Sequence, residues 1–211
     1  MIGIAVSSSS PAVAARCAHA RAEVGAVATQ NVTDPTLGPK GLDLMASGLA
    51  AEDALERLKR EARHIDYRQL ALVDSAGRTA AYSGTKTLGT HTSASGGGAV
   101  AAGNLLANSA VPQRMIDAFA AASHLELGDR LITAMRAGLA AGGEAGPVKS
   151  AGMLLVREVA WPVADLRVDW HEEPIDALAA LWVLWKPQLD DYVTRALNPA
   201  AAPGYGVPGE R

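Results

Sequence analysis

The sequence predicts an α+β protein with mostly antiparallel sheet, and two observations support this fold class. Strand-like and helix-like stretches occur in blocks, without the strict alternation that is typical of a doubly wound parallel sheet. Hydrophobic residues make up 49% of the 211 positions and charged residues 19%, which suits a packed core. Aromatic residues are only 4%, so we expect a core of alanine, leucine and valine.

The individual elements follow from local patterns. Short apolar runs between turn residues predict strands, and apolar residues at helical spacing predict helices. The predicted strands are residues 2–6, 24–29, 67–73, 78–83, 98–102, 153–157 and 166–169. The predicted helices are a short one from residue 42 that ends at Gly48, and residues 51–62, 111–123, 128–139 and 174–197. Residues 38–41 (Gly-Pro-Lys-Gly) predict a turn, and residues 83–98 are a polar, glycine-rich connection.

Composition excludes several classes of protein. Nineteen Lys and Arg against 22 Asp and Glu leave a net charge of −3. A protein that binds nucleic acid is expected to carry a basic surface instead. No apolar stretch is long enough for a signal peptide or a membrane span, so we expect a cytoplasmic protein that does not bind membranes. A single cysteine excludes a disulfide framework. We expect one domain over residues 1–198 and a loosely ordered Pro/Gly-rich tail over residues 199–211.

Metal and cofactor motifs are absent from the pattern. The five histidines are scattered, and His171-Glu172-Glu173 lacks a second histidine at position 175, so we expect a polar turn there and no metal or cofactor. The charges of Asp165–Asp169 alternate and therefore share one sheet face. That face is either a solvated edge, which we favour, or a ligand-facing set.

Two candidate nucleophiles have better structural explanations. Ser83 and Lys86 match a bare S-x-x-K pattern, but the glycine between them fits a hairpin-end loop better than a rigid helix. Cys17 and His19 are two residues apart, so their side chains do not face each other on a helix. We therefore expect a structural cysteine.

A stripe of large apolar residues marks the last predicted helix. Leu178, Leu181, Trp182, Trp185 and Leu189 recur at helical spacing. The stripe indicates core packing or a helix that docks on a second subunit. We expect a homo-oligomer, such as a dimer, formed through this helix.

The chain resembles a known family over nearly all of Gly3 to about Leu184. The motifs that carry the resemblance are IGIAVSSSSPAVAARC, VGAVATQNVTDPTLGPKGLDLMASGL, YRQLALVDSAGRTAAYSG, GGAVAAGNLL, KSAGMLLVRE and DLRVDWHEEPIDALAAL. The family is domain of unknown function family ten-twenty-eight, which is grouped with the Ntn-hydrolase superfamily. The resemblance implies a four-layer αββα sandwich, in which two packed antiparallel sheets have helices outside.

The superfamily resemblance also implies a chemistry. A Thr, Ser or Cys at the mature N-terminus attacks an amide carbonyl, its own α-amine takes the proton, and an oxyanion hole stabilises the intermediate. This sequence departs from the pattern, because family members open with a Thr-aromatic-Ser-Ile strand, whereas here Met1 and Ile2 supply no nucleophile. The leading hypothesis is an uncharacterised Ntn-hydrolase-like protein that hydrolyses small amide or peptide bonds, with its N-terminal nucleophile missing from this chain. The alternative is a catalytically silent binding or scaffold protein on the same fold.

The candidate site residues lie where predicted strands end. Asn104 is the candidate oxyanion donor or substrate anchor, Ser7 and Ser8 are the other catalytic candidates, and Asn31, Thr33 and Lys40 are the substrate-binding candidates. Each also fits an ordinary turn or cap. The expected ligand is a small molecule or short peptide.

Overall fold

The structure is a computed structural model that describes residues 1–207, and within them every strand pairing is antiparallel. This confirms the predicted mixed α and β class with antiparallel sheets. The strands are β1 (Ile2–Ser8), β2 (Ala18–Arg21), β3 (Gly25–Gln30), β4 (Gln69–Asp74), β5 (Thr79–Ser83), β6 (Thr90–Gly96), β7 (Ala99–Leu106), β8 (Ser150–Val156) and β9 (Ala164–Val168).

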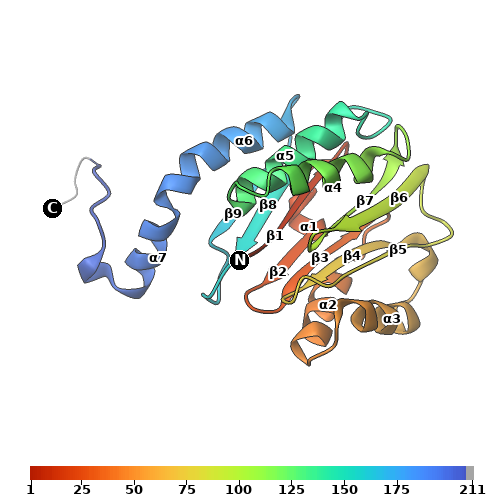
Figure 1. The fold of residues 1–211 in the computed structure, drawn as a ribbon, viewed down its shortest axis with the longest axis horizontal. Coiled ribbons are helices and arrows are strands. Elements are labelled where there is room, and N and C mark those ends of the chain that lie inside the picture. Colours follow the sequence, from red (N-terminus) through yellow and green to blue (C-terminus); the bar gives the residue numbers. More distant parts are fainter. Residues whose placement is uncertain (208–211) are drawn as a thin grey trace.

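The strands form three hydrogen-bonded groups. One sheet has the order β1-β8-β9, a second has the order β2-β3-β4-β5, and β6 pairs with β7 alone. The four-stranded sheet packs with β3 against β1 and with β4 against β7. The two smaller sheets therefore lie on the same side of the four-stranded one (Figure 1).

Helices cover the outer faces of these sheets (Figure 1). The helices are α1 (Ala14–Cys17), α2 (Leu37–Ala46), α3 (Ala51–Glu61), α4 (Val111–Ala121), α5 (Leu127–Ala140), α6 (Pro174–Trp185) and α7 (Leu189–Leu197). Helices α2 and α3 pack on the four-stranded sheet, α4 packs on β6 and β7, α5 on β1, and α6 on β8 and β9. Within residues 1–207, no helix is both long and apolar enough to cross a membrane.

The core is built from thin apolar side chains, as the composition predicts. Strand β8 is covered on both faces, and its Met153 and Leu155 are buried in one cluster with Leu178 and Trp182 of α6. A second cluster fills the space between the four-stranded sheet and α2 and α3, with Leu70 and other leucines at its centre. Two-sided burial explains the continuous apolar run of β8.

The predicted turn at residues 38–41 is wrong, because these residues belong to the first half of α2. Pro39 is the third residue of the helix, where a backbone N–H would have no partner within the helix, so proline is tolerated. Gly38 is required by packing rather than by a turn. A Cβ atom at this position would lie 2.1 Å from Cδ2 of His19.

Strand β6 arises from the polar stretch to which the sequence assigned no element. Its alternating Thr and Ser side chains are mostly exposed, so they show no buried apolar face. The strand is stabilised by its long pairing with β7 instead, for example Ala94 opposite Ala101. The two strands form a hairpin through Gly97 and Gly98, which both have positive φ, and pairing within this hairpin overrides the weak strand propensity of the polar residues.

The single helix predicted over residues 174–197 is wrong, because α6 and α7 are separated by a 3₁₀ turn at Lys186–Gln188. Pro187 lies in this turn, and a proline in a helix interior loses a hydrogen bond and collides with the preceding turn. Beyond α7, the guanidinium of Arg195 donates to the carbonyls of Pro203 and Gly204, so part of the predicted tail packs on the helix. Tail residues 208–211 lie outside the described residues.

Candidate functional site

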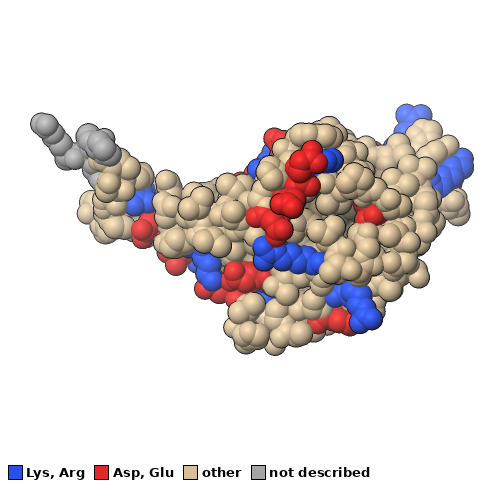
Figure 2. Space-filling model, turned by 90° about the horizontal axis from the view of Figure 1, so that it is seen from above, with Lys and Arg blue, Asp and Glu red and all other residues tan. Residues whose placement is uncertain are grey.

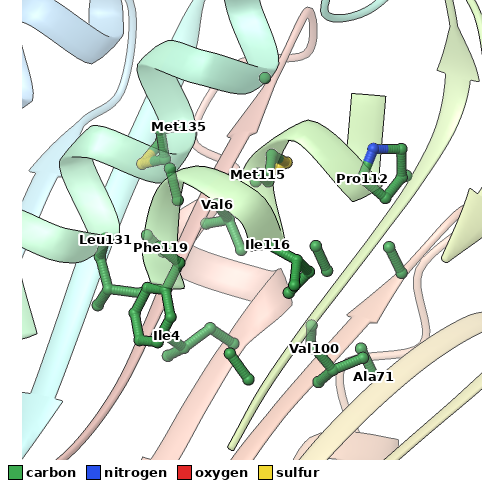
Figure 3. A pocket seen from close by; sticks show the side chains of 18 of the residues that line it. Ile4, Val6, Ala71, Val100, Pro112, Met115, Ile116, Phe119, Leu131 and Met135 are labelled. Carbon is green, nitrogen blue, oxygen red and sulfur yellow. The ribbon is translucent and has the colours of Figure 1, made fainter. Parts of the chain in front are cut away.

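A cavity of about 330 Å³ lies under α4 and α5, with β1 on one side and β7 on the other (Figure 3). Its volume falls in the range of small-molecule sites. The helices contribute large side chains, notably Met115, Ile116 and Phe119 from α4 and Leu131 from α5. These side chains make the helical wall of the cavity apolar.

The opposite wall is made of small residues on the four-stranded sheet. Ala26 and Ala28 of β3 and Ala71 of β4 line the cavity there. Alanine side chains leave depth between this sheet and the helices, which larger residues would fill. The sheet wall of the cavity is therefore built of small apolar side chains.

A hydrogen-bonded cluster of amides stands at one end of the cavity. The Nδ2 atom of Asn104 donates to Oε1 of Gln69 at 3.1 Å, and Nε2 of Gln30 donates to the same oxygen at 2.7 Å. Gln69 is fully buried, and its Nε2 donates to the carbonyl of Gly103 and to Oγ of Ser83. This network orients the Asn104 amide.

Asn104 keeps unused hydrogen-bonding capacity. The side chain is half-buried and lines the cavity. Within residues 1–207 the side chain forms one hydrogen bond, to Gln69, which leaves one Nδ2 hydrogen and the Oδ1 atom for a ligand. Asn104 can therefore act as both donor and acceptor toward an amide.

Ser7 also lines the cavity, whereas Ser8 does not. Ser7 lies near the end of β1, and no basic side chain of the described residues forms a hydrogen bond with its hydroxyl. The Oγ atom of Ser8 accepts the backbone N–H of Ser10 at 3.0 Å, so this hydroxyl stabilises a turn. Ser7 is thus placed to contact a ligand but lacks the base that a serine nucleophile needs.

Glu144 is a cavity residue that the sequence reasoning missed. Both carboxylate oxygens lie 3.2 Å from the backbone N–H of Ser9. Glu144 follows a pair of glycines in a loop. The only sequence signal for a functional role is that it is a single acidic residue in this loop. Gln30 and Gln69 were missed as well, although Gln30 is the last residue of the apolar strand β3 and Gln69 is the first residue of β4.

Asn31, Thr33 and Lys40 do not line the cavity. The buried Asn31 amide donates to the carbonyl of Tyr67 and accepts the backbone N–H of Leu88, so it ties two loops together. Lys40 is exposed on α2. Of the six residues proposed from the sequence, the structure brings Ser7 and Asn104 to one cavity.

Cys17 and His19 form no catalytic pair. The Sγ atom of Cys17 lies 3.5 Å from Oγ1 of Thr33, and burial raises the pKa of the Cys17 thiol despite this contact. The His19 ring packs against Gly38 and approaches the carbonyl of Arg16. A buried, protonated thiol without a base is a structural residue.

Comparison with protein families identifies the chain. Residues 1–178 match the model of a family of unknown function, DUF1028. The chain belongs to the DUF1028 family. A crystal structure of a DUF1028 protein from Silicibacter pomeroyi is similar, with 29% sequence identity and a TM-score of 0.81 over 90% of this chain and 83% of that one. No curated protein matches the chain significantly.

The other motifs of this DUF1028 chain have structural roles. Asp165 and Arg167 form an ion pair on the exposed part of β9, which agrees with a solvated edge. The Nδ1 atom of His171 accepts the N–H of Glu173 at the turn before α6. Acidic and basic side chains are interspersed on the face shown in Figure 2.

The tryptophan stripe of this DUF1028 chain packs within the chain. Trp182 is buried against Gly128, and its Nε1 atom donates to Asp129 at 2.9 Å. Trp185 donates to the carbonyl of Val163. Leu181, by contrast, lies on the exposed face of α6. The dimer stays a prediction, and its contact would be this exposed face rather than the tryptophans.

Proposed function

We propose that this protein binds an extended, largely apolar ligand that contains amide groups, such as a short peptide or an N-acyl amino acid, in the cavity between β1 and β7. The observation that carries the proposal is an apolar cavity with one oriented, partly unused amide at its wall. Ligand sites typically combine apolar walls with a few fixed polar groups.

The polar groups of the cavity fit an amide better than a charged ligand. Asn104 offers one donor and one acceptor, which match the carbonyl and N–H of an amide. The Ser7 hydroxyl is a neutral group that can act in either role. The Glu144 carboxylate, which accepts the N–H of Ser9, repels anionic groups nearby, so the carboxylate of an N-acyl amino acid would lie away from Glu144.

Amide hydrolysis is the second candidate function. The facing sheets with helices outside support the finer assignment to the four-layer Ntn-hydrolase sandwich. Met1, Ser7 and Asn104 line the same cavity, so a nucleophile at the head of β1 would stand near an oxyanion donor. Binding takes precedence because the described cavity residues include no hydroxyl or thiol paired with a base.

A binding and turnover assay on the same samples separates the two functions. We would displace the fluorescent dye 1-anilinonaphthalene-8-sulfonate from the protein with N-acyl amino acids and short peptides, and measure released amine in parallel. Ala28→Leu, which fills the cavity, should weaken binding at least about tenfold. The control Ala120→Leu adds the same atoms on the exposed face of α4 and should not.

Displacement without amine release supports the binding function. Release that is lost in Asn104→Ala supports the hydrolase instead. If no compound displaces the dye, or if Ala28→Leu and Ala120→Leu bind equally well, the cavity is not the ligand site.

A further inference from the structure

Strand β6 is the outermost strand at one side of the molecule (Figure 1). It pairs with β7 along one edge, and no strand of residues 1–207 pairs with its other edge. Residues of β7 line the cavity, whereas no residue of β6 does. The unpaired edge of β6 therefore faces away from the cavity and from β1, and it forms a separate part of the surface.

This edge lacks the features that keep exposed strands from pairing. Natural edge strands normally carry charged residues, proline or a bulge. Strand β6 (THTSASG) contains no proline and no Lys, Arg, Asp or Glu. Thr90 and Thr92 lie opposite Leu106 and Gly103, so two steps along β6 match three along β7, and the extra residue belongs to β7. Strand β6 is thus regular, uncharged and open to a further strand.

The opposite side of the molecule carries the protection that β6 lacks. Strands β9 and β2 are the outer strands of their sheets there. Asp165 and Arg167 form an ion pair on β9, and Arg21 of β2 pairs with Asp43. Next to β6, the outer strand of the four-stranded sheet is β5 (TAAYS), which is also uncharged. The absence of charge is therefore confined to one side of the molecule.

The side chains of β6 leave room for a neighbouring strand. A Cβ atom at Gly96 would lie 3.3 Å from Ile116 of α4, so this face of β6 is turned toward the helix. Thr92 and Ala94 share that face and are half-buried, while Ser93 and its neighbours on the other face are exposed. All of these side chains are small, so none of them blocks the free edge.

We propose that β6 pairs antiparallel with β6 of a second copy of this chain, about a two-fold axis at Ser93. Full overlap of the two strands places Ser93 opposite itself, His91 opposite Ser95 and Thr92 opposite Ala94. A two-fold axis brings the same surface of both copies together, and an uncharged strand can face its own copy without repulsion between like charges. About six backbone hydrogen bonds would form, and one continuous sheet would run β7-β6-β6-β7.

The other candidate contact between copies is the exposed face of α6, where Val183 and Leu184 are exposed. This helix lies far from β6 (Figure 1), so substitutions can separate the two contacts. Strand β6 is favoured because its edge offers backbone donors and acceptors, which fix the register of a partner strand, whereas the α6 face offers apolar contact alone.

The test begins with the mass of the full chain in solution. By size-exclusion chromatography with multi-angle light scattering, we expect twice the mass of one chain. Ser93→Lys places two like charges opposite each other and should raise the dissociation constant at least about tenfold. Ser123→Lys, at an exposed site after α4, and Leu184→Lys on α6 should leave the dimer intact. Circular dichroism verifies that each variant is folded.

Cysteine crosslinking tests the register without disturbing the fold. The Cα atoms of residues directly opposite each other are about 4.5–5.5 Å apart, which a disulfide can span. Oxidation by copper(II)–phenanthroline should therefore crosslink Ser93→Cys into a covalent dimer. In Ser95→Cys the two new thiols would be about 13 Å apart along the strands, so this variant should not crosslink. The natural Cys17 is buried and should not react.

Each outcome decides the proposal. A monomeric chain would overturn it, and so would a Ser93→Lys variant that dimerises as well as the unmodified protein. Dissociation by Leu184→Lys alone would move the contact to α6. Crosslinking of Ser95→Cys but not of Ser93→Cys would exclude the proposed pairing. None of these results depends on ligand binding, so the proposed function stands or falls separately.

Discussion

The side-chain amide of Asn104 donates to Oε1 of Gln69 at 3.1 Å, and this contact joins β7 to the four-stranded sheet at the wall of the cavity. Gln69 is fully buried, whereas Asn104 is half-buried. The two residues therefore have different roles. Gln69 holds the sheets together, and Asn104 presents the remaining part of its amide to the cavity.

Replacing Gln69 by leucine should lower the free energy of unfolding by about 2–4 kcal/mol, because the carbonyl of Gly103 and the amide of Gln30 would lose a buried partner. Urea unfolding followed by circular dichroism measures the change. The exposed Gln113 on α4 is the matched control, and Gln113→Leu should change stability by less than about 0.5 kcal/mol. Equal effects of the two substitutions would contradict a structural role for the network.

Replacing Asn104 by alanine should affect ligand binding more than stability. The variant loses one partly exposed hydrogen bond, so unfolding should change by about 1 kcal/mol or less, while ligand affinity should fall about tenfold. Dye displacement by N-acyl amino acids and urea unfolding measure the two quantities. Asn108→Ala, outside the cavity, should leave affinity unchanged. A loss of stability without a loss of affinity would rule out a ligand contact for Asn104.

Gly128 should not tolerate a side chain. A Cβ atom there would lie 2.4 Å from Cζ2 of Trp182, whose Nε1 atom is anchored to Asp129. Gly128→Ala should therefore destabilise the protein by about 1–3 kcal/mol, measured by thermal or urea unfolding. Gly146 has no atom within 4 Å of such a Cβ. If Gly146→Ala is as harmful as Gly128→Ala, the tight packing of the tryptophan is not the cause.

Asp74 should make stability depend on pH in the acid range. Burial raises the pKa of the carboxyl, but hydrogen bonds from the side chain and backbone of Arg78 outweigh this effect. With further N–H donors from Ala51 and Ala76, the pKa of Asp74 lies below its ordinary value. The stabilisation is therefore present above the unfolded-state pKa of about 3.9 and is lost as the pH falls through the lower folded-state value.

The measurement for Asp74 compares unfolding at two pH values. Asp74→Ala should cost about 3 kcal/mol at pH 7, and the difference from the unmodified protein should shrink below about pH 4. Asp117→Ala removes an exposed carboxylate and should hardly change stability at pH 7. A cost for Asp74→Ala that stays constant down to pH 2 would show that charge is not involved.

The predicted elements were most accurate where one local pattern dominates. The helix at Ala51–Glu61 and the hairpin partner at Thr79–Ser83 follow from helical spacing and from a turn signal, and both agree with the sequence prediction within a few residues. Strand β6 and the break at Pro187 were missed. The first depends on pairing with β7, and the second on the geometric cost of one proline inside an otherwise regular apolar pattern.

The candidate site was predictable only in part. Strand ends pointed to Ser7 and Asn104, which do line the cavity. The same reasoning selected Asn31, whose amide instead ties loops together. A polar residue at a strand end looks the same in sequence whether it faces a cavity or caps a turn, because only the neighbouring strands determine its surroundings.

The sequence by itself determined the α+β class and the apolar, aromatic-poor core, because these depend on composition and on periodicity within short windows. The tertiary structure decided the cavity and its amide network. Gln30 and Gln69 are 39 residues apart, and Gln69 and Asn104 are 35 apart. Contacts at such separations arise from the order and register of strands, which no local preference encodes.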